Sequence, residues 1–178
     1  NAIISMGDKI KSKMIAEKAS VNVVPGFIGE INNVNHAKEI SKKIGFPVIV
    51  KASAGGGGKG MRIVNSEEDV EEAFLRASSE AKNSFGDERL FVEKYLVEPR
   101  HIEIQIIADN YGNVVSLGER ECSIQRRNQK VIEEAPSSFL DETLRRDMST
   151  QAIMLAKEVE YSSAGTVEFI VDKDKNFY

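Results

Sequence analysis

The sequence has one cysteine, no long apolar run and no excess of positive charge, and each of these absences argues against a class of protein. A single cysteine, Cys122, rules out a disulfide within the chain and a cysteine zinc cluster. No apolar run approaches the length that crosses a bilayer. The formal net charge of −4 argues against a general nucleic-acid binder, although local basic patches remain possible. We therefore expect a globular chain whose partners are neither nucleic acid nor a membrane.

The most informative segment is a glycine-rich loop between two short apolar runs. Residues 47–64 read PVIVKASAGGGGKGMRIV. Four consecutive glycines allow successive backbone N–H groups to turn toward one anion, and Lys51 and Lys59 flank them with positive charge. This pattern favours a polyphosphate ligand. The alternative is a mobile surface hairpin, although plain linkers mix glycine with serine and lack flanking lysines.

Two familiar kinds of phosphate loop do not fit this segment. Gly55, Gly57 and Gly60 match G-x-G-x-x-G, but such a loop opens a helix, whereas the residues from Met61 onward have the pattern of a strand. A Walker A loop requires Ser or Thr at the position that Gly60 occupies. The remaining interpretation is a strand–loop–strand hairpin that folds over a nucleotide as a flap.

Apolar periodicity predicts three helices around this hairpin. Two are expected over about 6–19 and 33–44, with Gly45 ending the second. A third is expected to start with Ser66 as N-cap and with the acidic residues 67–69 in its first turn. Its predicted buried stripe is Val70, Ala73, Phe74, Ala77 and Ala81.

The pattern becomes typical of strands from residue 90 onward. Strands are expected over 90–95 and 101–106, the second with alternating polar and isoleucine faces. A longer strand follows the turn at 110–113, and another covers 166–171. A helix over about 141–160 separates them, and its predicted buried residues are Leu144, Met148, Ala152, Leu155, Ala156 and Val159. The fold class is α+β, with one unit around 23–95, another from 96 onward, and the nucleotide expected between them.

Three further features suggest chemistry, and each has a plainer reading. The polar face formed by His101, Glu103 and Gln105 could simply be the solvated side of a sheet. Glu168, a lone carboxylate in an apolar strand, requires an ion pair or a metal such as Mg²⁺. Residues 122–130 hold three cations in a predicted loop, which is either an anion pocket or solvated surface.

Taken together, the motifs resemble those of the biotin carboxylase component of biotin-dependent carboxylases, within the ATP-grasp superfamily. The resemblance extends over the whole chain through MGDK, KASAGGGGKGM, EKYL, PRHIEIQ, QRRNQKV, EEAP and AGTVEF. Asn128 stands where many relatives have His, and it favours the propionyl-type subgroup.

The resemblance implies a role for each matching residue. Lys9, Lys51 and the flap glycines Gly57 and Gly58 would hold ATP phosphates, and Met61 closes the flap motif. The further assignments are Glu93, Lys94, Tyr95 and Leu96 along the adenine edge, His101 on the nucleotide, Lys130 and Gln125 at bicarbonate and the terminal phosphate, and Glu168 on the metal.

The implied reaction uses ATP, Mg²⁺ or Mn²⁺ and bicarbonate to carboxylate biotin on a carrier domain outside this chain. A carboxyltransferase subunit is the expected further partner, in the mitochondrial matrix of a eukaryote or the cytoplasm of a bacterium. Residues 1–22 are interpreted as a linker helix, 23–95 as the lid subdomain with the flap, and 96–178 as part of the C-terminal ATP-grasp subdomain.

The last residues, FY, have the pattern of a strand that opens, so we expect a piece of a larger protein, truncated at its C-terminal end. Such a piece is expected to bind nucleotide without carboxylating biotin. Alternatives are another ATP-grasp ligase, such as carbamoyl-phosphate synthase or an amino-acid ligase, and a non-catalytic nucleotide-binding module.

Overall fold

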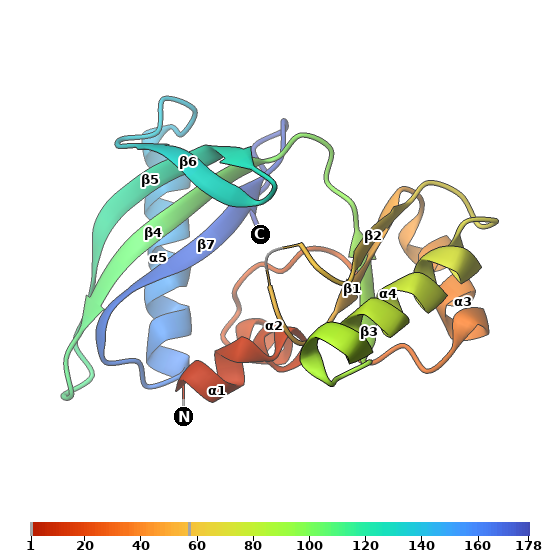
Figure 1. Ribbon diagram of the computed structural model, residues 1–178. Helices are drawn as coiled ribbons and strands as arrows, with labels where there is room; N and C mark the ends of the chain where they lie inside the picture. The colour runs from red at the N-terminus through yellow and green to blue at the C-terminus, as the bar shows by residue number, and fades with distance from the viewer. Residues whose placement is uncertain (1, 57) are drawn as a thin grey trace. The chain divides into compact units, whose positions relative to one another are not determined.

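The computed structural model describes residues 2–56 and 58–178 (Figure 1). The chain divides into two compact units. We call the first, Ile3–Met14 with Val24–Tyr95, the glycine-loop unit, and the second, chiefly Ile15–Val23 with Leu96–Tyr178, the open-sheet unit. Among the described residues, no helix is both long enough and apolar enough to span a membrane.

The N-terminal helical region contains two helices where the sequence predicted one over 6–19. Helix α1 covers Ala2–Gly7 and helix α2 covers Lys9–Lys18. Asp8 separates them, and its carboxylate accepts hydrogen bonds from the backbone N–H groups of Ile10 and Lys11. A short acidic side chain that bonds the following N–H groups starts a new helix instead of continuing the old one.

Helix α3, Val34–Ile44, confirms the second predicted helix. Asn33 is its N-cap, with a side chain that accepts from the His36 N–H, and Gly45 ends it with a φ of 82°. Helix α4, Val70–Phe85, starts later than predicted because Ser66 bonds the Asp69 carboxylate and not the helix backbone. The predicted stripe of α4 is buried at Val70, Ala73, Ala77 and Ala81, with Phe74 packed at its edge.

The glycine-loop unit is built on a three-stranded antiparallel sheet of order β2-β1-β3. Its strands are β1 (Val48–Ala52), β2 (Met61–Val64) and β3 (Leu90–Lys94). Val48, Val50 and Val92 point into the core shared with α3 and α4. The intervening positions on β1 and β3 therefore face the opposite side, because side chains alternate along a strand.

The open-sheet unit is a four-stranded antiparallel sheet of order β6-β5-β4-β7 with one helix along one face (Figure 1). The strands are β4 (Arg100–Ala108), β5 (Val114–Arg126), β6 (Gln129–Glu134) and β7 (Ser163–Val171). The helix is α5, Glu142–Glu158, capped by Asp141. The core confirms the predicted alternation on β4, because Ile102, Ile104 and Ile106 are buried together. The helix residues packed against them are Leu144, Met148, Ala152 and Ala156. Leu155 is buried as predicted, but Val159 is only half-buried at the helix end.

The basic segment 122–130 is a β-hairpin and not the loop that the sequence predicted. Strand β5 runs to Arg126 and β6 starts at Gln129, in antiparallel pairing. The two turn residues, Arg127 and Asn128, have φ values of 52° and 64°. Positive φ at both central positions is typical of a type I′ turn, whose twist suits a two-residue hairpin and which tolerates Asn.

Candidate functional site

The glycine loop joins β1 to β2 and contains backbone conformations that only glycine adopts readily. Gly55 and Gly58 have φ values of 83° and 80°. A Cβ at Gly55 would lie 2.2 Å from the Phe85 ring, whereas a Cβ at Gly56 would meet nothing within 4 Å. Gly57, one of the predicted flap residues, lies outside the described part of the chain.

Lys51 lies on the sheet face opposite α3 and α4, where it pairs with a buried carboxylate. Its Nζ contacts Glu93 Oε1, and Lys13 Nζ lies 2.5 Å from Glu93 Oε2. The Glu93 side chain is only 4% exposed. Burial raises the pKa of Glu93, but the charges and hydrogen bonds of Lys51 and Lys13 outweigh it and hold the pKa below its usual value.

Lys13 was missed by the sequence reasoning, although a signal was present. Lys9 and Lys13 are four residues apart on α2, so both project from one face of that helix. Lys9 Nζ donates to the carbonyl of Gly55 in the loop. Burial and the nearby charge of Lys51 lower the pKa of Lys9. The ammonium groups of Lys9 and Lys51 repel each other beside the glycine loop, and a bound anion would reduce that repulsion.

The predicted adenine segment has most of its backbone donors already engaged. The N–H of Lys94 donates to Pro25 and that of Tyr95 to Pro47, at 2.7 and 3.1 Å. The backbone N–H groups of Lys94 and Tyr95 are therefore not free to meet a base. Met61, also predicted, is half-buried directly opposite Lys51 in the β1–β2 register.

In the open-sheet unit, the face opposite α5 carries a cluster of charged side chains. The register places Glu103 of β4 beside Arg120 on β5 and Glu168 on β7. Glu103 is 3% exposed; its Oε1 accepts from Arg120 Nε at 2.6 Å, and its Oε2 contacts Lys130 Nζ. Glu103 belonged to the polar face noted in the sequence but was given no role, and Arg120 was not predicted. The alternation of side chains along a strand indicates which residues share a face. Only the register between β4 and β5 shows that Glu103 and Arg120 are opposite each other.

Lys130 is held between two carboxylates. Besides Glu103, its Nζ lies 2.6 Å from Glu168 Oε1. Burial lowers the pKa of Lys130, but the hydrogen bonds to Glu103 and Glu168 outweigh that effect, so the pKa lies above its usual value. The amine is therefore an ammonium group at neutral pH, suited to binding an anion and unsuited to acting as a base.

His101 and Gln125, both predicted, also lie in this cluster. Gln125 Nε2 lies 2.9 Å from the Cys122 carbonyl and 2.9 Å from His101 Nδ1. Because the amide nitrogen donates to both, Nδ1 is an acceptor and the imidazole proton is on Nε2. That Nε2 is buried without a hydrogen-bond partner among the described residues, and Glu168 Oε1 is 3.6 Å away. This N–H is thus a donor beside the Glu168 carboxylate, and a bound ligand that reached it would satisfy it.

Glu168 differs from the prediction in its burial. The sequence suggested a carboxylate enclosed by an apolar strand, but the side chain is 55% exposed because it lies on the open face. Of the two partners that the sequence suggested, an ion pair or a metal, the ion pair is present. His101 and Lys130 together lower the pKa of Glu168 to about 2, despite the opposing effect of partial burial.

The lowered pKa of Glu168 predicts a loss of stability in acid. Glutamate ordinarily titrates near 4.5, so between 4.5 and about 2 the unfolded chain binds more protons than the folded one. Stability from this group is complete above pH 4.5 and falls toward pH 2. Solvent screening of an exposed pair keeps the effect below about 1 kcal/mol.

This prediction is checked by urea unfolding of the wild-type chain and of Glu168→Gln at several pH values. The substitution is expected to make the loss of stability in acid shallower. Above pH 5 the dependence of stability on pH should not change, because an ordinary glutamate, with a pKa of about 4, is ionised there in both states. Parallel declines for the two proteins would show that Glu168 titrates normally.

Glu168 is also the residue best able to hold a divalent cation. Mg²⁺ prefers few carboxylates together with phosphate and water oxygens, which fits one exposed carboxylate. A second group, Glu103, Cys122 and Glu133, has ligand atoms within 4.8 Å of one another. It fits poorly, because burial, with a smaller contribution from Glu103, raises the pKa of Cys122 to about 11 and Glu103 is already engaged by Arg120 and Lys130.

Comparison with known sequences gives a consistent result. The family described as "Carbamoyl-phosphate synthase L chain, ATP binding domain" matches residues 8–178. A propionyl-CoA carboxylase alpha chain from Ruegeria pomeroyi is 62% identical over 177 residues, which make up 99% of this chain and 26% of that protein. The mitochondrial propionyl-CoA carboxylase alpha chain of Homo sapiens is 59% identical over 178 residues, 100% of this chain and 24% of that protein. The chain thus spans about a quarter of the length of these relatives.

Solved structures similar to this chain include biotin carboxylases. The biotin carboxylase–β-γ-ATP complex from Campylobacter jejuni has a TM-score of 0.97 and 50% identity, with 99% of this chain and 40% of that chain covered. The biotin carboxylase domain of the Hydrogenobacter thermophilus 2-oxoglutarate carboxylase, in complex with MgADP, ADP and bicarbonate, has a TM-score of 0.94 and 49% identity. There, 99% of this chain and 39% of that chain are covered.

Proposed function

The chain belongs to the carbamoyl-phosphate synthase L chain ATP-binding domain family and has the ATP-grasp fold of biotin carboxylases, and from this premise we propose that it supplies ATP- and bicarbonate-handling residues to a biotin carboxylase. The observation that carries this proposal is the ammonium group of Lys130, held with the His101 N–H donor on one open sheet face. The full-length protein would use MgATP and bicarbonate to carboxylate biotin on a carrier domain, as part of a propionyl-CoA carboxylase.

We assign the phosphates of ATP to the glycine-loop unit. Lys9 and Lys51 would neutralise phosphate oxygens, and Gly57 and Gly58, by their match to the flap motif, would offer backbone N–H groups. Phosphoryl transfer needs mainly positioning and charge neutralisation, which these groups can provide. Met61 and the segment 93–96 would line the base, the segment through its backbone groups.

We assign bicarbonate to the open-sheet unit. Lys130 would bind the anion and the transferring phosphoryl group, with Gln125 orienting His101 so that its N–H faces the nucleotide. Mg²⁺ or Mn²⁺ at Glu168 would neutralise further phosphate charge. Biotin would accept the CO₂ of the activated bicarbonate. Excluding water from the site would protect that activated species.

We make two finer assignments. Acyl-group choice would belong to a carboxyltransferase subunit, with which the full-length protein would assemble. Relatives are named both from mitochondria and from a bacterium, which supports a matrix location in a eukaryote and a cytoplasmic one in a bacterium.

The test is ATP cleavage by the full-length protein, with bicarbonate and biotin supplied separately and together. The proposal predicts phosphate release that requires both. Release with bicarbonate but without biotin would instead indicate a carbamoyl-phosphate-synthase type of ligase, and binding without any cleavage would indicate a non-catalytic module. Carboxylation of propionyl-CoA, compared with acetyl-CoA and pyruvate, then tests the subgroup.

A further inference from the structure

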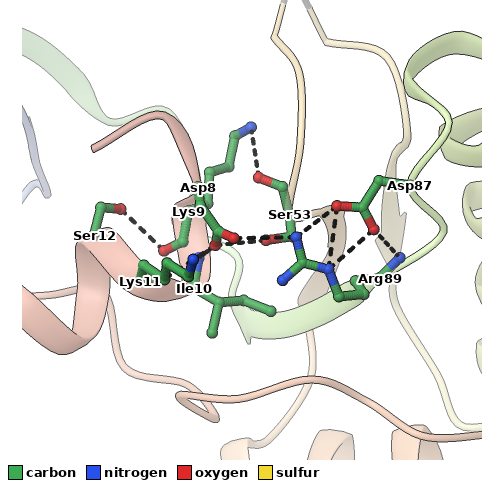
Figure 2. Close-up of polar contacts among 8 residues, drawn as sticks. All are labelled: Asp8, Lys9, Ile10, Lys11, Ser12, Ser53, Asp87 and Arg89. Carbon is green, nitrogen blue, oxygen red and sulfur yellow. Dashed lines mark hydrogen bonds and ion pairs between the residues drawn. The ribbon is translucent and has the colours of Figure 1, made fainter. Parts of the chain in front are cut away.

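Asp8, the residue between α1 and α2, is the centre of a polar network that no predicted site residue accounts for (Figure 2). Its Oδ1 accepts from the N–H groups of Ile10 and Lys11, both at 3.1 Å, and from Ser53 Oγ at 2.9 Å. Its Oδ2 accepts from Arg89 Nη2 at 3.1 Å. One carboxylate thereby joins the start of α2 to the end of β1 and to the residue before β3.

Arg89 is fixed from its other side by Asp87. Its Nη2 donates to Asp87 Oδ2 at 2.6 Å, and its Nε lies 3.0 and 3.1 Å from the two oxygens of the same carboxylate (Figure 2). The backbone carbonyl of Arg89 also accepts from the Ser53 N–H at 2.9 Å. Such forked, charge-assisted contacts set the orientation of a guanidinium group more firmly than a single hydrogen bond does.

The network lies directly beside Lys9, one of the residues that we assign to the phosphates. The Lys9 N–H donates to the Ser53 carbonyl at 3.1 Å, and its Nζ contacts the Gly55 carbonyl. Ser53 is fully buried and precedes the glycine loop by two residues. The position of Lys9 therefore depends on how Asp8 and Ser53 are held together.

We propose that Arg89 is a positioning residue for ATP, acting through Asp8 and Ser53 to hold Lys9 at the entrance of the glycine loop. This inference rests on the proposed function, because it assumes that Lys9 meets the phosphates. Without Arg89, the Asp8 side chain, which is 14% exposed, loses its cationic partner. The first turn of α2 then frays more easily, and Lys9 samples positions away from the phosphates.

The experiment measures ATP cleavage by the full-length protein as a function of ATP concentration. Arg89→Met keeps most of the side-chain length and removes the guanidinium group. It is expected to raise KM for ATP about 10-fold, with a smaller change in kcat. Arg76→Met is the matched control, because Arg76 is an exposed arginine of the same unit whose partner is Glu72 on the same helix turn.

A double substitution distinguishes positioning from general stabilisation. If Arg89 acts through Lys9, adding Arg89→Met to Lys9→Met should raise KM by less than about 2-fold, because coupled residues are not additive. Independent, additive increases would overturn the inference. Partial misfolding cannot imitate the expected result, since inactive protein lowers the apparent kcat and leaves KM unchanged.

The remaining outcomes separate this inference from the proposed function. If Lys9→Met raises KM but Arg89→Met changes it no more than Arg76→Met does, the inference alone is wrong. If Lys9→Met leaves KM unchanged, the phosphate role of Lys9 is wrong and the inference falls with it. If Arg89→Met is too unstable to purify, Asp87→Asn replaces it, because that substitution loosens the same guanidinium group. Asp87→Asn is also expected to raise KM for ATP, and an unchanged KM would overturn the inference.

Discussion

Replacing Lys130 by methionine is expected to slow ATP cleavage by the full-length protein, with bicarbonate and biotin both present, about 100- to 1,000-fold, the range for loss of one preorganised charge donor. The pKa of Lys130 lies above its usual value, so the side chain stays positively charged at neutral pH and would neutralise the anions that we assign to it. Methionine has similar length and no charge. Single-turnover measurements would place the loss in the chemical step and not in nucleotide binding.

Two controls accompany the Lys130 prediction. Lys173→Met removes an exposed lysine of the same unit and should leave the rate unchanged. The fold of Lys130→Met should persist, because Glu103 keeps its ion pair with Arg120. A well-folded Lys130→Met protein with a rate within a few-fold of wild type, well below the loss of about 100-fold expected here, would contradict the assignment.

Replacing Gly55 by alanine is expected to lower the free energy of unfolding by about 3 kcal/mol, from backbone strain and a steric clash combined. The φ of 83° disfavours any side chain, and the new Cβ would lie 2.2 Å from the ring of Phe85. The ring cannot move away freely, because it packs against the core of the glycine-loop unit. Urea unfolding followed by far-UV circular dichroism measures the change.

The matched control is the neighbouring glycine. Gly56→Ala meets no atom within 4 Å and has no positive φ, so its effect should lie within about 1 kcal/mol and could be slightly stabilising. Equal effects of the two substitutions would contradict the role of the Phe85 contact. A large effect at Gly55 alone would show that the loop is anchored at its entrance.

Local signals in the sequence predicted much of the fold. The cap at Asn33, the glycine at 45 and the isoleucine alternation over 101–106 each depend on neighbours within one element, and each was confirmed. The glycine loop and its flanking strands were equally local. Strand β6 was missed because almost all its side chains are exposed and its two apolar residues, Val131 and Ile132, are adjacent. It therefore lacks the apolar alternation that marks a half-buried strand.

The pairings inside the candidate site could not be predicted in this way. Asp8 and Arg89 are 81 residues apart and Glu103 and Lys130 are 27 apart, so their contacts depend on tertiary packing and strand register. Resemblance to a family identified Lys9, Lys51, His101, Lys130 and Glu168 as site residues, and their functional roles remain predictions. It did not identify the partners that hold them, namely Lys13, Glu103, Arg120 and Arg89.

The mutual neutralisation of Lys130 and Glu168 would make the proposed anion and cation binding cooperative. In the free protein the two groups satisfy each other at 2.6 Å, so a lone anion must first displace a carboxylate and a lone cation must first displace an ammonium group. Whichever ligand arrives first releases the group that the other requires. By thermodynamic reciprocity, each then strengthens the binding of the other by the same factor. Such a pair of ligands would bind tightly together and weakly apart, which would disfavour complexes that hold only one of the two.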